Sequence, residues 1–359
     1  MIIASDRIQK IKKVKIFRKY VKAAKGIQRV ESLNAADPIL LDTSLGSYNA
    51  GDYIIMHFIE KQLSEIWGNL DDRIPTHVFP KIMPKNVQNR MKILCGTNAL
   101  SGNLDTMHSV GNWITLPNDA SQYEHSLLML AVGMRNVEAG KGGFTPRAAA
   151  VLRYLLTDQF VHSVRDSHTE KALNEIGINN VVNTSCVTMW DLTPDFCRSI
   201  PCDKAEDVLT TITDYDFDPE NDGYMLQTLK RHYRRVYLWL QGADDLNCLK
   251  SLQGVDGIHL VHGGLSGLEE FVSTHENFDY FGTRLHCGIY CLNHQIRSMI
   301  VSIDNRAADI QQDTNIPTVQ RCALKTDMER LIEDSRSTDI HIPVDSIKIW
   351  KNQFLALEE

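Results

Sequence analysis

Short apolar runs and helically spaced apolar positions take turns along most of this chain. The first run, at residues 38–43, leads into a glycine-containing turn at 44–52, and residues 53–67 then place apolar side chains at helical spacing. Strand, turn and helix in this order predict the opening of a Rossmann-like domain. The turn lacks the G-x-G-x-x-G fingerprint, so the sequence does not predict a dinucleotide site there.

The same alternation predicts the remaining elements. Further strands are expected at 76–79, 91–95, 113–116, 127–133, 160–163 and 180–182, and then at 207–213, 235–240, 257–261, 278–281 and 299–303. Helices are expected at 147–156, 169–176, 223–234, 287–294, 326–333 and 347–359. Alternation of this kind is typical of parallel sheets with helices on both faces.

The alternation is interrupted at residues 190–205, which we interpret as an interdomain linker. The expected parts are a basic amphipathic N-terminal segment at 1–30, an N-terminal Rossmann-like domain at 31–195, a C-terminal Rossmann-like domain at 196–325 and a C-terminal helical tail at 326–359. The predicted fold class is therefore α/β, with two Rossmann-like domains facing across a cleft. Many glycosyltransferases have this architecture, with the active site between the two domains.

Composition indicates a globular cytoplasmic protein. Of 359 residues, 43% are hydrophobic and 23% are charged, and no apolar run reaches the roughly 18 residues that a membrane span needs. The first residues lack the apolar core and cleavage site of a secretory signal. The eight cysteines form no C-x-x-C pair, which favours reduced thiols over a disulfide framework.

The charge is distributed unevenly. The chain has a formal net charge of −7, yet residues 7–25 carry nine cations and no acid, with apolar side chains at roughly helical spacing. One interpretation is a peripheral helix on the anionic inner face of the membrane, where each cation contributes about 1 kcal/mol. The other is a solvated basic helix packed on the acidic remainder of the protein. A nucleic-acid partner is not expected, because that acidic remainder would repel phosphates.

Three polar clusters follow predicted strands. In parallel sheets, ligands lie beyond the carboxyl ends of the strands, where helix N-termini also favour anions. The first cluster contains Asn49, Gly51 and Asp52, and on its own Asp52 is better explained as a helix N-cap. The second contains Arg165 and Asp166, which on their own are better explained as a surface ion pair beside a cap. The third, residues 282–286, places an arginine and a histidine directly behind a buried strand, which favours an anion site.

Together these segments resemble the polysaccharide pyruvyl transferase family. The matching features are S-Y-N-A-G-D-Y at 47–53, S-V-R-D-S-H-T at 163–169, and F-G-T-R-L-H at 281–286 with the trailing I-V-S-I-D at 300–304. The resemblance runs from about residue 40 to residue 310. It implies a fold of the glycosyltransferase-B type and the transfer of a carboxyethylidene (pyruvyl) group from phosphoenolpyruvate to two hydroxyls of a sugar, which forms a cyclic ketal.

The resemblance also implies roles for particular residues. Arg165, Arg284, Leu285 and His286 occupy the positions that are thought to hold phosphoenolpyruvate in the family, and the turn with Asn49 and Gly51 matches the N-terminal N-x-G-D signature. Phosphoenolpyruvate is the donor substrate, and no other cofactor and no metal are expected. The expected acceptor is a sugar of a surface polysaccharide or of its precursor linked to a polyprenyl diphosphate.

The residue types suit this chemistry. Phosphoenolpyruvate carries a carboxylate and a phosphate, and the planar fork of arginine binds either group through two hydrogen bonds. The reaction needs a general acid, a general base and stabilisation of the leaving phosphate. His286 is the candidate acid or phosphate donor, because histidine titrates near neutral pH. Asp52 is the candidate base for the acceptor hydroxyl, and His262, after a predicted strand, either contacts the sugar or only turns the chain.

Two alternative functions remain open at this stage. A glycosyltransferase of the same fold would use Arg284 and His286 to bind the diphosphate of a nucleotide sugar. A non-catalytic glycan-binding protein of this fold would need neither Arg165 nor Arg284. A zinc site that includes Cys287 and Cys291 is disfavoured relative to thiols that pack in the core. Residues 214–219 are interpreted as a solvated loop over the cleft.

Overall fold

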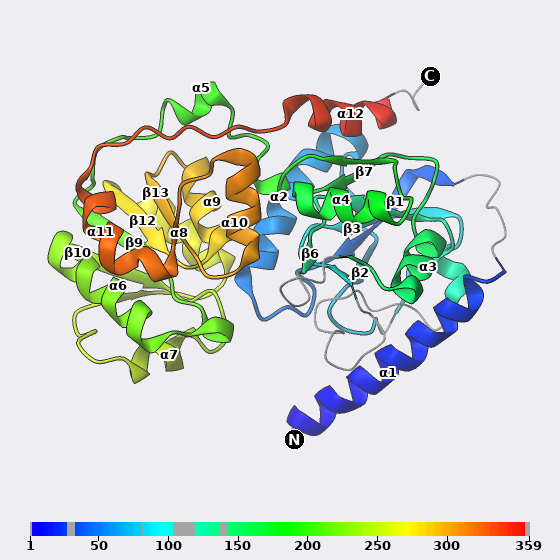
Figure 1. The fold of residues 1–359 in the computed structure, drawn as a ribbon, viewed down its shortest axis with the longest axis horizontal. Coiled ribbons are helices and arrows are strands. Elements are labelled where there is room, and N and C mark those ends of the chain that lie inside the picture. Colours follow the sequence, from blue (N-terminus) through cyan, green and yellow to red (C-terminus); the bar gives the residue numbers. More distant parts are fainter. Residues whose placement is uncertain (1, 27–32, 81, 103–118, 136–142, 356–359) are drawn as a thin grey trace. The chain divides into compact units, whose positions relative to one another are not determined.

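The computed structural model describes residues 2–26, 33–80, 82–102, 119–135 and 143–355, and it consists of two compact units (Figure 1). Unit 1 comprises Met1–Ser47, Ile55–Val187 and Pro343–Glu359, and unit 2 comprises Tyr48–Ile54 and Thr188–Ile342. All strand pairings within both units are parallel, and helices connect most of the strands. The predicted α/β class is therefore confirmed. The strand predicted at 113–116 lies outside the described residues.

Unit 1 is built on a parallel sheet in the order β2-β1-β3-β5. The strands of this unit are β1 (Asn34–Asp42), β2 (Arg73–Pro75), β3 (Arg90–Cys95), β4 (Leu100–Ser101), β5 (Leu127–Leu130), β6 (Met134–Arg135), β7 (His162–Val164) and β8 (Val181–Asn183). The pair β7-β8 continues this arrangement through a parallel bridge between Val132 and Val164. The small pair β4-β6 was not predicted.

The strand predicted at 76–79 is wrong, because β2 ends at Pro75. The partner strand β1 ends at Asp42, which pairs with Pro75, and the Thr76 amide donates the last hydrogen bond to the Asp42 carbonyl at 3.1 Å. Beyond that point the chain has no further length of β1 to pair with. The prediction failed because the length of a strand depends on its partner, and β1 ends at Asp42.

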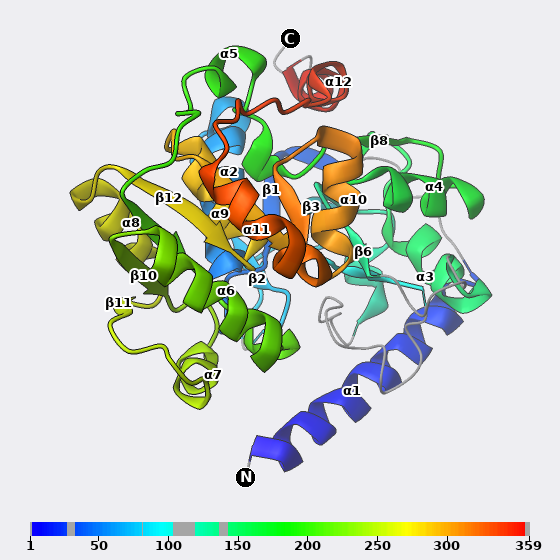
Figure 2. The same ribbon diagram turned by 60° about the vertical axis from the view of Figure 1, so that its left-hand side comes forward.

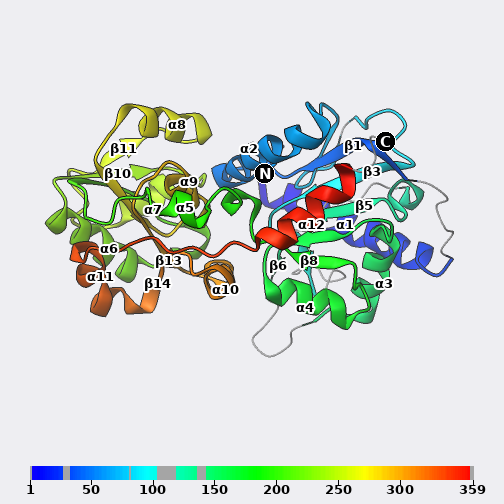
Figure 3. The same cartoon turned by 90° about the horizontal axis from the view of Figure 1, so that it is seen from above.

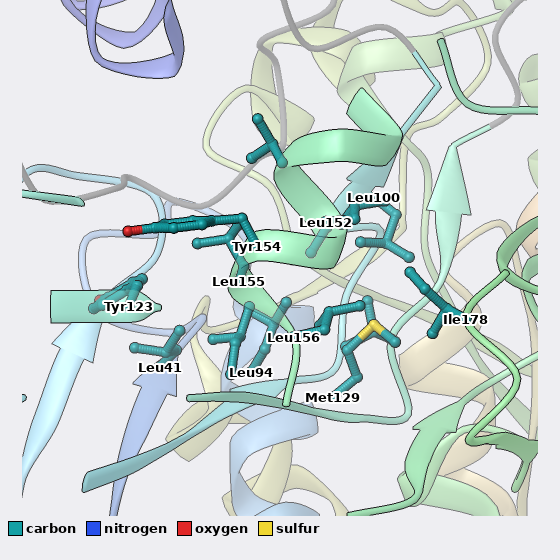
Figure 4. Close-up of a cluster of buried hydrophobic side chains, with 14 of the residues drawn as sticks. Leu41, Leu94, Leu100, Tyr123, Met129, Leu152, Tyr154, Leu155, Leu156 and Ile178 are labelled. Atoms are coloured by element: carbon teal, nitrogen blue, oxygen red, sulfur yellow. The ribbon is translucent and has the colours of Figure 1, made fainter. Parts of the chain in front are cut away.

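The helices of unit 1 cover its sheet and enclose one core. They are α1 (Ile2–Ala23), α2 (Ala50–Trp67), α3 (Pro146–Leu155), α4 (Ser167–Glu175) and α12 (Val344–Leu355), with the 3₁₀ turns η1 (Ala120–Tyr123) and η2 (Val187–Met189). The first turn of α2 is assigned to unit 2, as is most of η2. Figure 4 shows core side chains from β1, β3 and β5 packed against those of η1 and α3.

The basic helix α1 is partly integrated into this core. Ile16, Phe17 and Tyr20 are buried, and the Tyr20 ring meets the Tyr154 ring edge to face, with centroids 6.1 Å apart. The opposite side of the helix exposes Lys12, Lys15, Arg18, Lys19, Lys22 and Lys25. Figure 2 shows α1 running out from α3 towards its N-terminus. Among the described residues, no helix combines the length and the apolar character needed to cross a bilayer.

The C-terminal helix α12 packs on unit 1 (Figure 3). The rings of Trp67 and Phe354 lie 4.6 Å apart between centroids, and Lys351 Nζ donates to Gln62 Oε1 at 2.6 Å. The amide of Val161 donates to Gln353 Oε1 at 2.7 Å. The helix begins three residues earlier than the predicted start at 347 and is described as far as Leu355. Residues 356–359 lie outside the described part.

Unit 2 contains a six-stranded parallel sheet in the order β11-β10-β9-β12-β13-β14. Its strands are β9 (Asp207–Thr210), β10 (Arg235–Trp239), β11 (His259–Val261), β12 (Phe278–Gly282), β13 (Ser298–Ser302) and β14 (Thr318–Gln320). Numbered along the chain, this is the order 3-2-1-4-5-6 of a doubly wound sheet. The order reverses between β9 and β12, and ligands of such sheets bind beyond the carboxyl ends of the strands at that point.

The helices of unit 2 lie between these strands in sequence. They are α5 (Pro194–Cys197), α6 (Pro219–His232), α7 (Asp245–Ser251), α8 (Leu265–Thr274), α9 (Leu285–Asn293), α10 (Asn305–Thr314) and α11 (Leu324–Glu333), with the 3₁₀ turns η3 (Asp214–Asp216) and η4 (Arg321–Ala323). Helices α6 and α11 pack side by side (Figure 1), and both contribute to a core with β9, β10 and β13. Strand β14 and helices α7, α8 and α10 were not predicted.

Candidate functional site

The strand order of unit 2 reverses between β9 and β12, a position called the switch point, and close backbone contacts join the carboxyl ends of these two strands there. A Cβ at Gly282, the last residue of β12, would lie 2.6 Å from the backbone nitrogen of Thr211, so only glycine fits. The amide of Thr283 donates to the Thr211 carbonyl at 3.1 Å, and the amide of Arg284 donates to Thr211 Oγ1 at 3.1 Å. The chain direction at Arg284 is therefore fixed before helix α9 begins.

Arg284 is held at this switch point by two carboxylates and a carbonyl. Its Nε donates to the Ile212 carbonyl at 3.0 Å, and its Nη2 donates to Asp214 Oδ1 at 2.9 Å and to Asp245 Oδ1 at 2.5 Å. The side chain is 3% exposed. Such a geometry fixes one edge of the guanidinium plane, and both carboxylates come from segments that follow other strands of the same sheet.

The two carboxylates differ in their environments. Burial raises the pKa of Asp245 above its ordinary value. The Arg284 guanidinium and the backbone amide of Gly242 act in the opposite direction but do not outweigh burial. The amides of Gln241 and Gly242 donate to Asp245 Oδ2 at 3.0 and 2.7 Å. For Asp214 burial also acts upward, but the Arg284 guanidinium and two backbone amides outweigh it and hold the pKa below its ordinary value. Asp214 is thus the carboxylate that stays ionised most readily beside Arg284.

Arg284, Leu285 and His286 line one pocket of about 20 Å³. Leu285 and His286 form the first turn of α9, with side chains 8% and 6% exposed. The other lining residues are Asn49, Tyr215, Gln241, Thr283, Val301, Ile303, Asp304, Arg306 and Ala307. A volume of this size holds roughly one water molecule. The structure thus brings together the arginine, leucine and histidine that the sequence singled out.

Sequence reasoning missed Arg306, the second arginine of this pocket. It follows β13 and lies in the first turn of α10, capped by Asp304, just as Arg284 follows β12 and precedes α9. Its Nε and Nη2 donate to Asp304 Oδ2 at 2.9 and 2.6 Å, and Nη2 also donates to the Tyr215 hydroxyl. The signal in the sequence was an arginine two residues beyond the aspartate that ends a predicted strand.

Residues 214–219 are not the solvated loop that the sequence suggested. Asp214 is bonded to Arg284, and the centre of the Tyr215 ring lies 5.3 Å from the Arg284 guanidinium carbon and 5.4 Å from that of Arg306. At these distances the ring attracts both cations. Within this segment, Tyr215 therefore forms part of the pocket wall.

Asn49 belongs to the same pocket, and its side chain explains the turn before α2. The Gln241 side-chain nitrogen donates to Asn49 Oδ1 at 2.8 Å, and the Gly51 amide donates to the same oxygen at 3.1 Å. Asn49 is thus the N-cap of α2, whereas the sequence pattern alone favours Asp52 for this role. Gly51 leaves room for Gln241, because a Cβ there would lie 2.8 Å from Nε2.

Asp52 and His262 are not among the described residues that line this pocket. Asp52 lies in the first turn of α2, where it is 7% exposed, and its amide donates to the Asn49 carbonyl at 3.1 Å. His262 follows β11, the edge strand of the sheet, and is exposed. Strands β10 and β9 separate β11 from β12.

Arg165 lies at the carboxyl end of β7 in unit 1. It is 2% exposed, its Nη2 donates to Asn98 Oδ1, and its Nε donates to Asp166 Oδ2 at 3.3 Å. The Arg165–Asp166 pair is buried, so the expectation of a surface pair is wrong. Asp166 is also the cap of α4, because its Oδ1 accepts from the Thr169 amide at 2.7 Å.

Gly133 permits this position of Arg165. A Cβ on Gly133 would lie 2.5 Å from Cζ of the guanidinium. The side chain is therefore packed flat against a backbone segment that follows β5. Arg165 belongs to unit 1 and Arg284 to unit 2, so their joint action on one ligand stays a prediction.

The thiols of α9 pack in the core of unit 2, as expected. Cys287 and Cys291 are both fully buried, and burial raises the pKa of the Cys287 thiol well above its ordinary value. A thiol with a raised pKa is a poor metal ligand, because metals bind the thiolate. Within the described ranges, no group of three or more histidine, cysteine or acidic side chains is arranged to hold a metal ion.

Comparison with known proteins gives one family. Residues 49–305 match the family model described as polysaccharide pyruvyl transferase. No curated protein matches the chain. Among solved structures, a UDP-GlcNAc 2-epimerase from Methanocaldococcus jannaschii is similar over 89% of this chain and 99% of its own, with 10% identity and a TM-score of 0.49. The wall teichoic acid polymerase TagF is similar over 98% of this chain and 90% of its own, with 10% identity and a TM-score of 0.37.

Proposed function

The chain belongs to the polysaccharide pyruvyl transferase family, and we propose that it transfers a pyruvyl group from phosphoenolpyruvate to two hydroxyls of one sugar. The product is a cyclic ketal on a surface polysaccharide or on its lipid-linked precursor, and phosphate is released. The observation that carries this proposal is the pocket at the switch point of unit 2. There Arg284, Leu285 and His286 converge with Arg306 inside the part of the chain that the family model covers or adjoins.

The donor suits this pocket because it has two anionic groups. Arg284 and Arg306 provide two guanidinium groups from the ends of adjacent strands, and arginine binds carboxylate or phosphate through paired hydrogen bonds. The first turn of α9 adds backbone amides that favour an anion. Arg165 of unit 1 is proposed as a further cationic contact, which would engage the donor from the other unit.

The reaction needs two bond-forming steps at the same carbon. A proton is delivered to the methylene carbon of the enol, and the first sugar hydroxyl bonds to C2 while losing its proton. The C2–O bond to phosphate then breaks, and phosphate leaves with the proton of the first hydroxyl. The second hydroxyl bonds to C2 and closes the ring, and its proton restores the acid that protonated the methylene carbon. We assign proton delivery or phosphate stabilisation to His286, because it lies in the pocket wall beside both arginines. Asp52 is proposed as the base for the acceptor hydroxyl.

The test is an assay of phosphate release. Phosphoenolpyruvate is mixed with a panel of glycans, and both phosphate and the mass of the glycan are measured. The wild-type chain should release phosphate only with a glycan whose mass rises by one carboxyethylidene group. Arg284→Gln and Arg306→Gln should each lower kcat/KM by about 100-fold or more, since each removes a charge-assisted contact to the donor. Arg198→Gln, at the exposed arginine that follows the last residue of α5, is the matched control and should change little.

Asp52→Asn separates the roles of base and binder. It should abolish turnover while phosphoenolpyruvate still raises the melting temperature, because the change leaves the pocket of Arg284 intact. Normal turnover of this variant would remove Asp52 from the mechanism. Stabilisation of the wild-type chain by nucleotide sugars, with none by phosphoenolpyruvate, would instead identify a glycosyltransferase.

The location that we propose is the inner face of the membrane, with α1 as the contact. Part of the apolar side of α1 is buried in unit 1, and the exposed side carries Lys15, Arg18 and Lys22 among its cations. Such a face binds anionic lipid by charge and does not require the insertion of apolar side chains. An acceptor linked to a polyprenyl diphosphate would be held at the same surface.

A further inference from the structure

The 3₁₀ turn η3 (Asp214–Asp216) contacts both arginines of the pocket with two consecutive side chains. Asp214 accepts from Arg284 Nη2 at 2.9 Å, and the hydroxyl of Tyr215 accepts from Arg306 Nη2. The Tyr215 ring lies over both guanidinium groups. A carboxylate on one arginine and an oxygen on the other are the kinds of contact that a donor with a carboxylate and a phosphate would make.

The pocket is too small for such a donor as long as η3 keeps this position. Its volume of about 20 Å³ accommodates roughly one water molecule, whereas a three-carbon acid with a phosphate is several times larger. Nη2 of Arg284 already donates to Asp214, and Nη2 of Arg306 already donates to Tyr215. A ligand therefore gains Nη2 of Arg284 and Nη2 of Arg306 together only if Asp214 and Tyr215 move away.

Tyr215 is the exposed part of η3, and Asp216 is its anchor. Tyr215 is 58% exposed, so its ring can leave the guanidinium groups without crossing packed side chains. Arg321 holds the other end, since its Nη1 donates to the Asp216 carbonyl at 2.6 Å and its Nη2 to Asp216 Oδ2 at 2.8 Å. At the opposite end, the Asp214 amide donates to Asp245 Oδ1 at 3.2 Å and Asp214 Oδ2 accepts from the Asp244 amide at 3.1 Å, so movement of η3 about Asp216 breaks these two contacts as well.

The remaining support of Arg284 does not depend on η3. Asp245 and the Ile212 carbonyl bind the same guanidinium from buried positions. When Asp214 leaves, Arg284 keeps its orientation and gains a free donor and a less neutralised charge. Arg306 likewise keeps its two bonds to Asp304.

We propose that Asp214 and Tyr215 act as an internal substitute for the donor, occupying Arg284 and Arg306 until phosphoenolpyruvate displaces η3. The two residues set the affinity for the donor, because its apparent dissociation constant includes the fraction of molecules in which η3 has moved. They also discriminate between ligands, since only an anion that satisfies both arginines replaces both contacts. This inference rests on the proposed function for the identity of the donor.

The test measures binding rather than turnover. Asp214→Asn keeps the shape of the side chain and removes its charge, and Tyr215→Phe keeps the ring and removes the hydroxyl. Each should lower the dissociation constants of phosphoenolpyruvate and of inorganic phosphate by about three- to tenfold, measured by calorimetry on the full chain, because each raises the fraction of molecules with η3 displaced. The double variant should bind more tightly than either single variant. Tighter binding cannot come from damage to the fold, which would weaken it.

Two controls separate displacement of η3 from general effects. Asp218→Asn makes the same charge change four residues farther on, at the cap of α6, where asparagine caps equally well. Tyr224→Phe removes a hydroxyl from a tyrosine of α6 outside the pocket. Both variants should leave the two dissociation constants unchanged. If Asp218→Asn and Asp214→Asn lower the dissociation constants equally, the change in net charge alone explains the tighter binding, and the proposal is overturned.

The remaining outcomes are equally distinct. If the wild-type chain binds phosphoenolpyruvate, Arg306→Gln abolishes the binding, and the variants of η3 bind no better than wild type, then the proposed function stands and the role of η3 is overturned. Weaker binding by Tyr215→Phe has the same consequence, because it makes the hydroxyl a contact to the donor. If neither anion binds to wild type or to any variant, the proposed donor is wrong and this inference fails with it.

Discussion

Arg284 and Asp245 form a buried ion pair, in which Nη2 of the arginine lies 2.5 Å from Oδ1 of the aspartate and the side chains are 3% and 0% exposed. The pair joins the N-cap residue of α9 to the first turn of α7. Because removal of one partner leaves the other charge buried, such a pair fixes its arginine far more strictly than a surface contact does.

Removal of Asp245 should therefore damage both stability and donor binding. Asp245→Ala leaves the Arg284 charge with Asp214 alone and deprives the amides of Gln241 and Gly242 of their acceptor. We expect a loss of about 3–5 kcal/mol in the free energy of unfolding, measured by urea denaturation, and weaker binding of phosphoenolpyruvate. Asp244→Ala, at the exposed neighbour, is the control. Equal stability of the two variants would contradict the structural role of the pair.

Gly242→Ala should displace Arg284 by steric contact. A Cβ at this position would lie 2.6 Å from Asp214 Oδ2 and 2.8 Å from Asp245 Oδ1, closer than real Cβ atoms approach. We expect kcat/KM for phosphoenolpyruvate to fall by about 100-fold, as for a catalytic contact misplaced by about 1 Å. Gly223→Ala is the matched control. Gly223 lies within α6, and a Cβ there would meet only Leu252 Cδ2, at 3.7 Å. Activity should therefore persist, and the higher helix propensity of alanine should stabilise the chain slightly.

Lys92 should make the stability of unit 1 depend on pH. Its side chain is fully buried in β3, Nζ donates to Ser126 Oγ at 2.9 Å, and burial, aided by the charge of Arg90, lowers the pKa from 10.5 to about 7. Between these two values the unfolded chain binds the proton that the folded chain releases, so the contribution of Lys92 to stability falls as the pH drops from about 10 to about 7.

Lys92→Met removes this penalty. We expect the variant to melt at a higher temperature than wild type at about pH 7, and the difference should shrink towards about pH 10, because neutral lysine costs less to bury. Lys250→Met, on the exposed side of α7, should show no such trend. A difference in melting temperature that is constant with pH would show that the buried amine does not titrate in this range.

The exposed cations of α1 should govern attachment to anionic membranes. Replacement of Lys15, Arg18 and Lys22 by glutamine leaves the buried face of Ile16, Phe17 and Tyr20 untouched. With about 1 kcal/mol per cation near the surface, association with phosphatidylserine vesicles should weaken by about tenfold or more, and salt should weaken it further. Deletion of the whole helix is a poorer experiment, because it would remove core side chains.

The control for this experiment makes the same change of charge elsewhere. Replacement of Arg198, Lys250 and Lys348 by glutamine removes three exposed cations that lie outside α1. This variant should associate with the vesicles about as well as wild type. If both triple variants behave alike, or if neither loses association, α1 is only a solvated helix that packs on unit 1.

Much of the fold was readable from the sequence because local patterns carry it. Buried parallel strands are short apolar runs, and the runs at β1, β3, β9, β10, β12 and β13 are sharply bounded by polar turns. The short strand β14 and the helices α8 and α10 were missed because their apolar positions are few or their faces are half exposed. The strand predicted at 76–79 failed because the length of a strand depends on its partner.

The sequence by itself determined that Arg284, Leu285 and His286 follow a buried strand and open a helix, since these facts are local. It also indicated that Arg165 follows a strand, whereas Arg306 after β13 was missed. Only the tertiary structure decided what surrounds them, because Asp214, Tyr215, Asp245 and Arg306 reach the pocket from the ends of other strands, up to about a hundred residues away. The strand order β9-β12-β13 makes those ends neighbours, and no local pattern encodes that order.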